Sequence, residues 1–215
     1  MWCCCATEEQ DKQFDVGDDG SRRPPMVEVQ KTFADDDEAE GAAVFTASLS
    51  RNHGLLGLSV DRSDTNCVVI RDVTGGAAGA WNQLMPHKEI RTYDQVLEVN
   101  GELVNGDDIA RKLEADAQEI VLKFRRPEER KVVLEKPGRL GIDVNYRKTS
   151  VKPWIASISP GLVADWNKEN PDIAALPHDR ITAVNEVAGN IDTILEKLRS
   201  PDKRLVLTVM HYEAY

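Results

Sequence analysis

The chain has 215 residues, enough for one or two domains, and a formal net charge of −10. Residues 1–42 hold twelve acids and four bases, a net charge of −8, which leaves −2 for the other residues. An acidic chain with no Lys/Arg stripe argues against nucleic-acid binding. No apolar run reaches the roughly 18 residues of a membrane-spanning helix, and the first residues lack the basic and apolar regions of a secretion signal. We therefore expect a cytoplasmic protein.

The N-terminal segment, residues 1–42, is rich in Asp, Glu, Gly, Pro and Gln. Such a composition buries too little apolar surface to offset the entropy lost on ordering, so it predicts disorder. Within this segment Cys3, Cys4 and Cys5 are adjacent. They lack the ligand spacing of a zinc site, and as an exposed cluster they suit S-acylation, which would hold the chain at the cytoplasmic face of a membrane. The alternative interpretation is an unmodified terminal segment.

From Val44 onward the sequence alternates between short apolar runs and polar turns. The polar stretch 63–66 separates two β-branched runs, which is a hairpin signal, and Asn100-Gly101 is a turn dipeptide. The segment 107–114 has acids in its first turn and apolar residues at helical spacing, which predicts an amphipathic helix. The apolar residues are Ile109, Ala110 and Leu113. The predicted strands are 44–49, 56–62, 67–73, 95–99 and 120–125, and the predicted helices are 76–84 and 107–114.

The second half of the chain repeats the first. Leu-Gly-Leu-Ser-Val at 56–60 returns as Leu-Gly-Ile-Asp-Val at 140–144, Trp81 returns as Trp166, and Asp94 returns as Asp179. The offsets are 84, 85 and 85 (140 − 56, 166 − 81 and 179 − 94). A period of this length fits a small self-contained domain.

The repeat predicts the same elements in the second copy, after a short junction at Pro127 and Glu128-Glu129. The predicted strands are 131–134, 140–146, 154–158, 180–184 and 205–210, and the predicted helices are 163–168 and 191–198. The domains are then a disordered acidic segment at 1–42, a first copy at 43–127 and a second copy at 128–213.

The order of elements, with an apolar-Gly-apolar motif on the second strand and Asn-Gly after the fourth, resembles the PDZ domain. The motif is Leu56-Gly57-Leu58 in the first copy and Leu140-Gly141-Ile142 in the second. The resemblance covers about residues 43–213. It implies an α+β fold of two PDZ-like, partly open β-barrels of five or six strands, each with two helices.

The resemblance also implies a binding site in each copy. Backbone N–H groups at Leu56, Gly57 and Leu58 would form a nest for a carboxylate, and a side chain at position 57 would obstruct it. An extended peptide would then add to the exposed edge of this strand, with Arg51 adding attraction for the carboxylate. The predicted peptide-binding residues are Arg51, Leu56, Gly57, Leu58, Ser59, Val60, Gly106, Ala110 and Leu113 in the first copy and Arg139, Leu140, Gly141, Ile142, Asp143, Val144, Ile191, Leu195 and Leu198 in the second.

In the PDZ family the first residue of the second helix reads the third-from-last side chain of the ligand. The matched positions are Gly106 and Ile191. Neither side chain forms a hydrogen bond, so the resemblance does not predict a preference for Ser or Thr in the ligand. Ile191 suits an apolar ligand residue, and Gly106 leaves the preference of the first copy open.

These features favour a non-enzymatic adaptor that binds the C-terminal tails of other proteins. The histidines are scattered, and neither a phosphate-binding glycine loop nor a nucleophile elbow is present, so we expect no metal, cofactor or catalytic residues. The alternative is a structural protein whose paired modules tether or self-associate without free grooves. Cys67 is expected to be a buried apolar residue, and Trp81 and Trp166 are expected to be packing residues.

Overall fold

The computed structural model describes residues 44–51, 54–114, 118–135 and 137–213, all of which belong to one compact unit, Glu38–Tyr215. The predictions for residues 1–42, including the acylation of Cys3, Cys4 and Cys5, lie outside the described residues. We call the elements between residues 44 and 125 module 1 and those between 128 and 211 module 2. The predicted domain limits at 42, 127 and 213 stay predictions.

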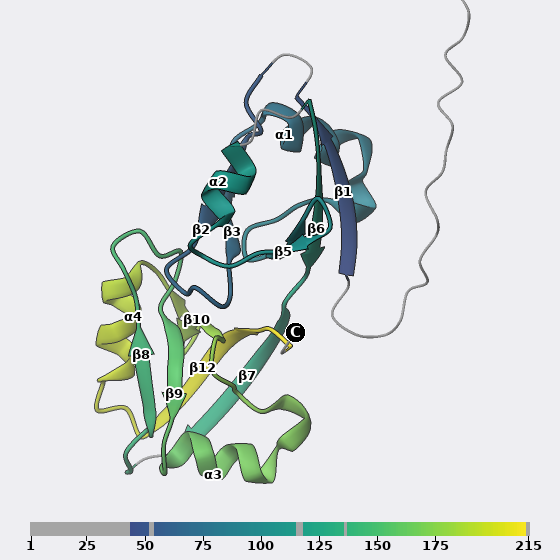
Figure 1. Ribbon diagram of the computed structural model, residues 1–215. Coiled ribbons are helices and arrows are strands. Elements are labelled where there is room, and N and C mark those ends of the chain that lie inside the picture. Colours follow the sequence, from purple (N-terminus) through teal and green to yellow (C-terminus); the bar gives the residue numbers. More distant parts are fainter. Residues whose placement is uncertain (1–43, 52–53, 115–117, 136, 214–215) are drawn as a thin grey trace, which may run out of the picture. The chain divides into compact units, whose positions relative to one another are not determined.

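Module 1 is an open antiparallel sheet with two α-helices (Figure 1). The strand order is β1-β6-β4-β3-β2, and β5 pairs with β4. Strands β1 and β2 are therefore the two ends of the sheet, as expected for a partly open barrel. The elements are β1 (Val44–Ser50), β2 (Leu58–Asp61), β3 (Val69–Val73), α1 (Gly76–Leu84), η1 (Pro86–Lys88), β4 (Gln95–Val99), β5 (Glu102–Leu103), α2 (Ile109–Glu114) and β6 (Glu119–Arg125).

Module 2 has the same architecture. Its strand order is β7-β12-β10-β9-β8, and β11 pairs with β10, so each strand occupies the place of its counterpart in module 1. The predicted fold of two PDZ-like modules is confirmed by this repetition. The elements are β7 (Glu128–Glu135), β8 (Ile142–Asn145), β9 (Trp154–Ile158), α3 (Leu162–Glu169), η2 (Pro171–Ile173), β10 (Arg180–Val184), β11 (Val187–Ala188), α4 (Ile191–Leu198) and β12 (Arg204–His211).

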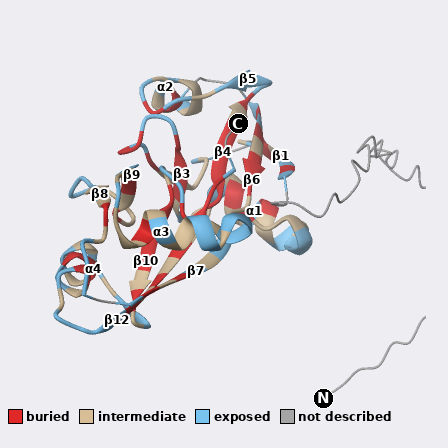
Figure 2. Ribbon diagram, turned by 90° about the horizontal axis from the view of Figure 1, so that it is seen from below, coloured by how far each residue is buried: buried red, intermediate tan, exposed pale blue. Residues whose placement is uncertain are grey.

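Alternating residues of the long strands form the two cores (Figure 2). In module 1, Phe45 and Leu49 of β1 lie opposite Phe124 and Ile120 of β6 and are buried with them. In module 2, alternate residues of β7 and β12 are buried in the same way. Trp81 is buried; its hydrogen bond to the Lys88 carbonyl and the partly buried Trp166 agree with the expected packing role.

Some predicted element limits were wrong. The predicted strands 56–62 and 140–146 begin later, at Leu58 and Ile142, because the preceding residues form a loop at a positive-φ glycine. The predicted helix 107–114 begins at Ile109, after a turn in which the Asn105 side chain accepts hydrogen bonds from the N–H groups of Asp107 and Asp108. The short strands β5 and β11 and the 3₁₀ helices were not predicted.

The junction between the modules is shorter than predicted. Glu128 and Glu129 belong to β7, where they pair with His211 and Met210 of β12. Only Arg126 and Pro127 separate β6 from β7.

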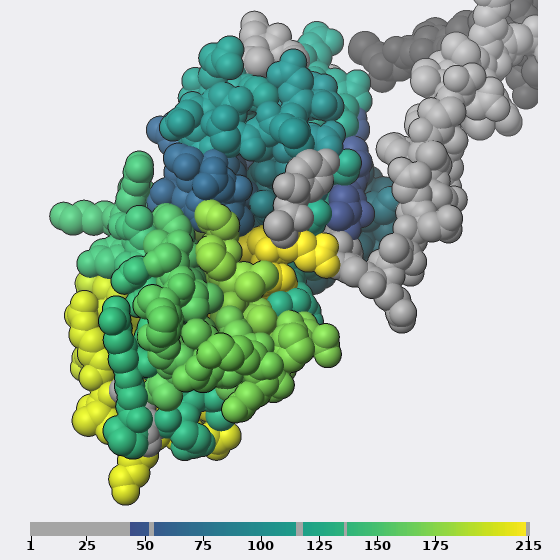
Figure 3. Space-filling view, turned by 60° about the horizontal axis from the view of Figure 1, so that its bottom comes forward, coloured from purple at the N-terminus to yellow at the C-terminus, as the bar shows by residue number. Residues whose placement is uncertain are grey.

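Polar contacts join the two modules, and Asp61, Asp64 and Arg180 are buried in them. Arg180 Nη1 donates to Asp61 Oδ2 at 2.9 Å, and His178 Nδ1 lies 2.7 Å from Asp64 Oδ2. Tyr212 follows module 2, and its hydroxyl donates to the Tyr93 carbonyl at 3.0 Å. Figure 3 shows yellow residues near the C-terminal end of the chain where the two modules meet. Tyr212 packs with Cys67, which is buried as predicted. Among the described residues, no helix is long and apolar enough to span a membrane.

Candidate functional site

The apolar-Gly-apolar loop of module 1 is held against the start of α1 by three backbone hydrogen bonds. The N–H of Thr74 donates to the Gly57 carbonyl at 2.9 Å, that of Ala77 to Leu55 at 3.1 Å, and that of Ala78 to Leu56 at 3.0 Å. Three successive carbonyls of the loop are thus satisfied by the segment that leads into α1. The backbone carbonyls of the loop, and not its N–H groups, therefore form the hydrogen bonds that hold it in place.

Module 2 reproduces this arrangement bond for bond. The carbonyls of Arg139, Leu140 and Gly141 accept hydrogen bonds of 2.8–3.0 Å from Leu162, Val163 and Ser159, respectively. The two loops therefore share one backbone conformation, and the sequence repeat extends to the hydrogen bonds of the predicted site.

Glycine is required at the centre of both loops. Gly57 has φ +74° and Gly141 has φ +76°, a region that L-residues rarely adopt. A Cβ at position 57 would lie 1.7 Å from the Gly75 carbonyl oxygen, and one at position 141 would lie 2.5 Å from that of Ser159. Any side chain at either position would push the loop away from the segment that leads into its helix.

The loops leave donors free. In the described part of the chain, the N–H groups of Leu56 and Gly57 form no hydrogen bond, and neither do those of Leu140 and Gly141. Successive unpaired N–H groups around a glycine with positive φ can form an anion-binding concavity. Both modules have the backbone geometry that such a nest requires.

In module 1 the loop opens into a cavity of about 520 Å³ between β2 and α2. Its walls are mainly apolar, and Ala110 and Leu113 of α2 face the loop and β2 across it. The lining residues are Arg51, Gly54, Leu55, Leu56, Gly57, Leu58, Val60, Thr74, Ala110, Leu113 and Glu114. Seven of the nine residues predicted for this groove therefore line one cavity.

The two exceptions are Ser59 and Gly106. Ser59 is half-buried and does not line the cavity, as alternation along β2 between Leu58 and Val60 requires. Gly106 is buried beneath the loop after β2, where its N–H donates to the Thr65 carbonyl at 2.9 Å. This placement removes Gly106 from the residues that we propose for ligand contact.

Arg51 connects the loop of module 1 to α2. Its Nη2 donates to the Leu113 carbonyl near the C-terminal end of the helix, and its backbone N–H donates to the Gln118 carbonyl. Arg51 lines the same cavity as Leu56 and Gly57. Its guanidinium adds positive charge to the wall of that cavity.

The groove of module 2 is more tightly filled than that of module 1. Leu195 replaces Ala110, and both Leu195 and Leu198 are buried, whereas Ala110 and Leu113 are half-buried. Ile142 and Val144 of β8 pack against the core of module 2, as do Leu140 of the preceding loop and Ile191 of α4. The longer side chain on α4 therefore occupies space that is open in module 1.

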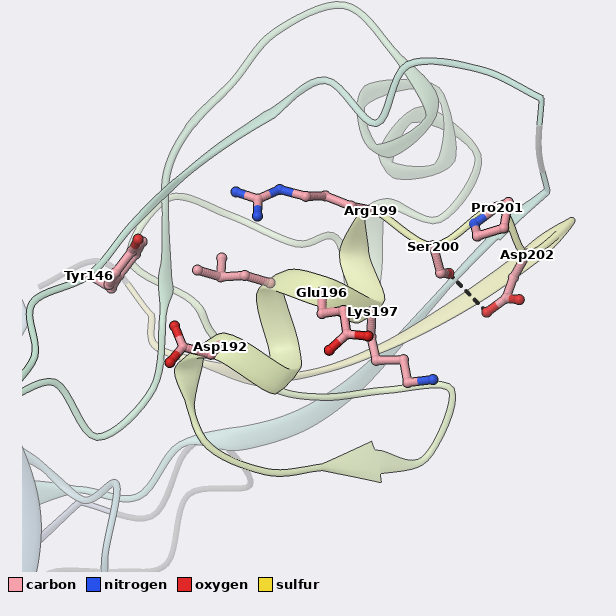
Figure 4. A pocket seen from close by; sticks show the side chains of 9 residues that line it. Tyr146, Asp192, Glu196, Lys197, Arg199, Ser200, Pro201 and Asp202 are labelled. Carbon is pink, nitrogen blue, oxygen red and sulfur yellow. Dashed lines mark hydrogen bonds between the residues drawn. The ribbon is translucent and has the colours of Figure 1, made fainter.

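The hollow along α4 in module 2 is polar instead, with a volume of about 650 Å³. Figure 4 shows the Arg199 side chain extending from the end of α4 toward Tyr146, with Asp192 at the start of the helix. Of the predicted residues, Leu195 is the one that lines this hollow. Arg139 and Asp143 are exposed, and Asp143 accepts a hydrogen bond from the Ser157 hydroxyl.

Other chemistry is not assembled at these grooves. Within the described ranges, no group of three or more His, Cys, Asp or Glu residues could hold a metal ion. The buried Cys67 thiol lies in the contact between the modules, where desolvation raises its pKa to about 12. A thiol in that state is a packing residue and not a nucleophile.

Strand order, the glycine loop against the first helix, and the groove beside the second helix define two PDZ-like modules in tandem. Solved structures similar to the chain include the second PDZ domain of Dlg1 from the choanoflagellate Monosiga brevicollis, at 23% identity and a TM-score of 0.32, covering 38% of this chain and 97% of that one. A second is INAD PDZ45 in complex with NORPA CC-PBM, at 16% identity and a TM-score of 0.34, covering 80% of this chain and 96% of that one. Comparisons with protein-family models and with curated proteins gave no match.

Proposed function

We propose that the protein is a non-enzymatic adaptor that binds the C-terminal tail of a partner protein in the groove of module 1. The observation that carries this function is the cavity of about 520 Å³ that begins at the unpaired N–H groups of Leu56 and Gly57. A terminal carboxylate would accept hydrogen bonds from these groups, and its last side chain would enter the apolar space between β2 and α2.

The sheet edge supports the same function. Strand β2 is the end of the sheet path and pairs with β3 alone among the described strands. Such an edge offers N–H and C=O groups to an added strand, which would supply affinity without depending on ligand sequence. Specificity would then come from the cavity, whose apolar walls favour an aliphatic last residue.

Module 2 has the same nest but a filled groove, so we propose that module 1 is the main binding site. The open cavity also favours this function over the alternative of paired modules without free grooves. The proposed membrane tether through Cys3, Cys4 and Cys5 rests on the sequence alone. It predicts that a fatty-acid label incorporated in cells is lost when all three cysteines are replaced by serine.

The decisive experiment compares pairs of peptides that differ only at the terminus. Peptides selected from a random C-terminal library are titrated into the full chain as free acids and as amides. We expect amidation to weaken binding at least about tenfold, because the nest then loses its anion. Gly57→Glu should abolish binding, whereas Gly141→Glu should retain most of it. Equal affinity for acid and amide would rule out the carboxylate role.

A further inference from the structure

A short loop of module 2 exposes apolar side chains where the matched loop of module 1 is charged. The segment 171–177 lies between α3 and β10, and its Ile173 and Leu176 are 40% and 41% exposed. Pro171 and Pro177 of the same segment are exposed as well. We call these four side chains the apolar patch. Single apolar residues on a surface need no explanation, whereas several on one loop are candidates for a contact.

Module 1 provides an internal comparison for the patch. The 3₁₀ helices η1 and η2 begin with prolines at an offset of 85 (171 − 86), so the two loops match. Ile173 then corresponds to Lys88 (173 − 85) and Leu176 to Arg91 (176 − 85). Arg91 is exposed and pairs with Glu89. Because the same loop carries charged side chains in module 1, the fold does not require apolar residues at these positions.

The patch is too small for a stable contact with a separate protein. Four residues form it, whereas a stable interface uses about 20–30 residues from each partner. A segment of the same chain needs far less contact, because its covalent link gives it an effective concentration of the order of millimolar. The size of the patch therefore favours a tethered segment over a second copy or a partner protein.

The start of β1 and the last described residues lie together. Val44 is the first residue of β1 and pairs with Arg125 of β6. Arg125 Nη1 in turn donates to the Glu213 carbonyl at 2.6 Å. Residues 1–43 therefore join module 1 close to the end of module 2.

The same end of module 2 leads to the patch. The Tyr212 N–H donates to Asp179 Oδ1 at 3.4 Å, and Asp179 Oδ2 accepts the Leu176 N–H at 2.9 Å. By standard dimensions the path of contacts from Val44 to Leu176 is on the order of 30 Å long. Phe33 lies eleven residues before Val44 (44 − 33), and eleven extended residues span up to about 36–40 Å. The chain that precedes β1 can therefore reach the patch.

The part of this chain that fits the patch is the segment 26–33. Its net charge is zero, because Glu28 and Lys31 balance, whereas residues 35–38 are all acids. Covering the patch with this segment would remove apolar surface of both from water. The apolar residues of the segment are Met26, Val27, Val29 and Phe33.

We propose that residues 26–33 dock on the apolar patch of module 2. The inference does not depend on the groove of module 1 and goes beyond the proposed function. Docking would shorten the free chain between Cys5 and the modules from 38 residues (43 − 5) to 20 residues (25 − 5). The patch would thus limit how far the modules can lie from whatever holds the first residues of the chain.

Hydrogen exchange of the full chain tests the docking. Exchange in a peptide that covers residues 26–33 is compared between the wild type and Ile173→Lys/Leu176→Arg, which introduces the residue types of the matched loop. We expect exchange at least about threefold faster in the variant, because the docked state protects the segment. Exchange in β12 should be unchanged, which shows that the fold is kept. Equal exchange of the segment in both chains overturns the proposal and leaves the proposed function standing.

Val187→Lys is the matched control, because Val187 is 37% exposed in the same module but outside the patch. It should keep the wild-type exchange of residues 26–33. An acceleration as large as that of the patch variant would show that the protection does not come from the patch. Protection that rises with protein concentration would assign the patch to a second copy, and this too overturns docking within one chain.

A complementary variant changes the tail instead of the patch. Val29→Ser/Phe33→Ser removes two apolar side chains of the segment and should speed trypsin cleavage after Lys31 at least about threefold. Combining it with the patch variant should give no further acceleration, because both changes remove the same contact. Accelerations that multiply in the combined chain would show that the segment and the patch act separately, and would overturn the proposal.

Discussion

Asp61 and Arg180 form an ion pair at 2.9 Å across the two modules, with side chains at most 1% exposed. Arg180 Nη1 also donates to the Lys152 carbonyl at 3.2 Å and Nη2 to that of Cys67 at 3.3 Å. Charges so deeply buried persist only when paired and hydrogen-bonded. The pair therefore makes the packing of each module depend on the other.

Breaking this pair from one side should destabilise the protein strongly. Arg180→Met and Asp61→Leu should each lower the free energy of unfolding by about 3–5 kcal/mol, because each leaves one buried charge without its partner. The double variant should lose much less than the sum of the two. Urea denaturation of the four chains tests the coupling, and strictly additive losses would contradict it.

Gly57→Ala should weaken both folding and binding. The added methyl group would lie 1.7 Å from the Gly75 carbonyl oxygen at a φ of +74°, a conformation that costs a non-glycine residue about 1–3 kcal/mol before the steric clash is counted. Gly79→Ala in α1 is the control and should be neutral or stabilising by up to about 1 kcal/mol. Equal stability and peptide affinity in the two variants would refute the requirement for glycine.

Exchanging the residues at positions 110 and 195 should close the groove of module 1 and open that of module 2. Ala110→Leu introduces the residue that fills module 2 and should lower peptide affinity about tenfold or more, by occupying the cavity. Leu195→Ala should open module 2 at a cost of about 2–5 kcal/mol in unfolding free energy, because the side chain is 9% exposed. Calorimetric titration of both variants with the same free-acid peptide checks the exchange. An Ala110→Leu chain that binds as well as wild type would place the ligand elsewhere.

The stability of the protein should fall in alkali. Burial raises the pKa of Cys67 from 9.0 to about 12, and burial also raises the pKa of Tyr212 well above 10.0. Burial favours the neutral forms of both groups in the folded state, so neither group reduces the stability of the protein below pH 9. Above their unfolded pKa values the groups ionise first in the unfolded chain, and this lowers the free energy of unfolding. Each group should lower the unfolding free energy by up to about 1.4 kcal/mol per pH unit above its unfolded pKa.

Two variants separate these contributions. Cys67→Val should flatten the decline that begins near pH 9, and Tyr212→Phe should flatten the part that begins near pH 10. Chemical denaturation at pH 8, 9, 10 and 11 measures both. A stability that stays constant over this range would contradict the burial of the two groups.

The order of elements was predictable because each strand and helix carries its own local pattern, and the pattern occurs twice. Leu56-Gly57-Leu58 and its copy were found from sequence, since a glycine between apolar residues marks the loop in both halves. The filled groove of module 2 was not found from the sequence. Leu195 stands where module 1 has Ala110, and this change keeps the apolar pattern of the helix while it removes the open space in the groove.

The short junction indicates that the modules pack as one unit, but the residues of the contact were missed, because Asp61 and Arg180 are 119 positions apart and follow no period. The repeat nevertheless held a signal. Asp61 corresponds to Asn145, at an offset of 84 (145 − 61), and Arg180 corresponds to Gln95, at an offset of 85 (180 − 95). Each copy thus carries a charge at a strand position where the other has a neutral amide. One copy carries an acid and the other a base, each at a position whose counterpart is neutral. Such a pair of opposite charges points to an interface between the repeats.

The ion pair between Asp61 and Arg180 also limits how the two modules can be separated by recombination. A recombination event that carried residues 43–127 alone into another protein would transplant the Asp61 carboxylate without its counter-ion and would expose Cys67 and Val69 to water. The reciprocal fragment would carry an orphaned guanidinium. We therefore expect the two modules to remain together during evolution.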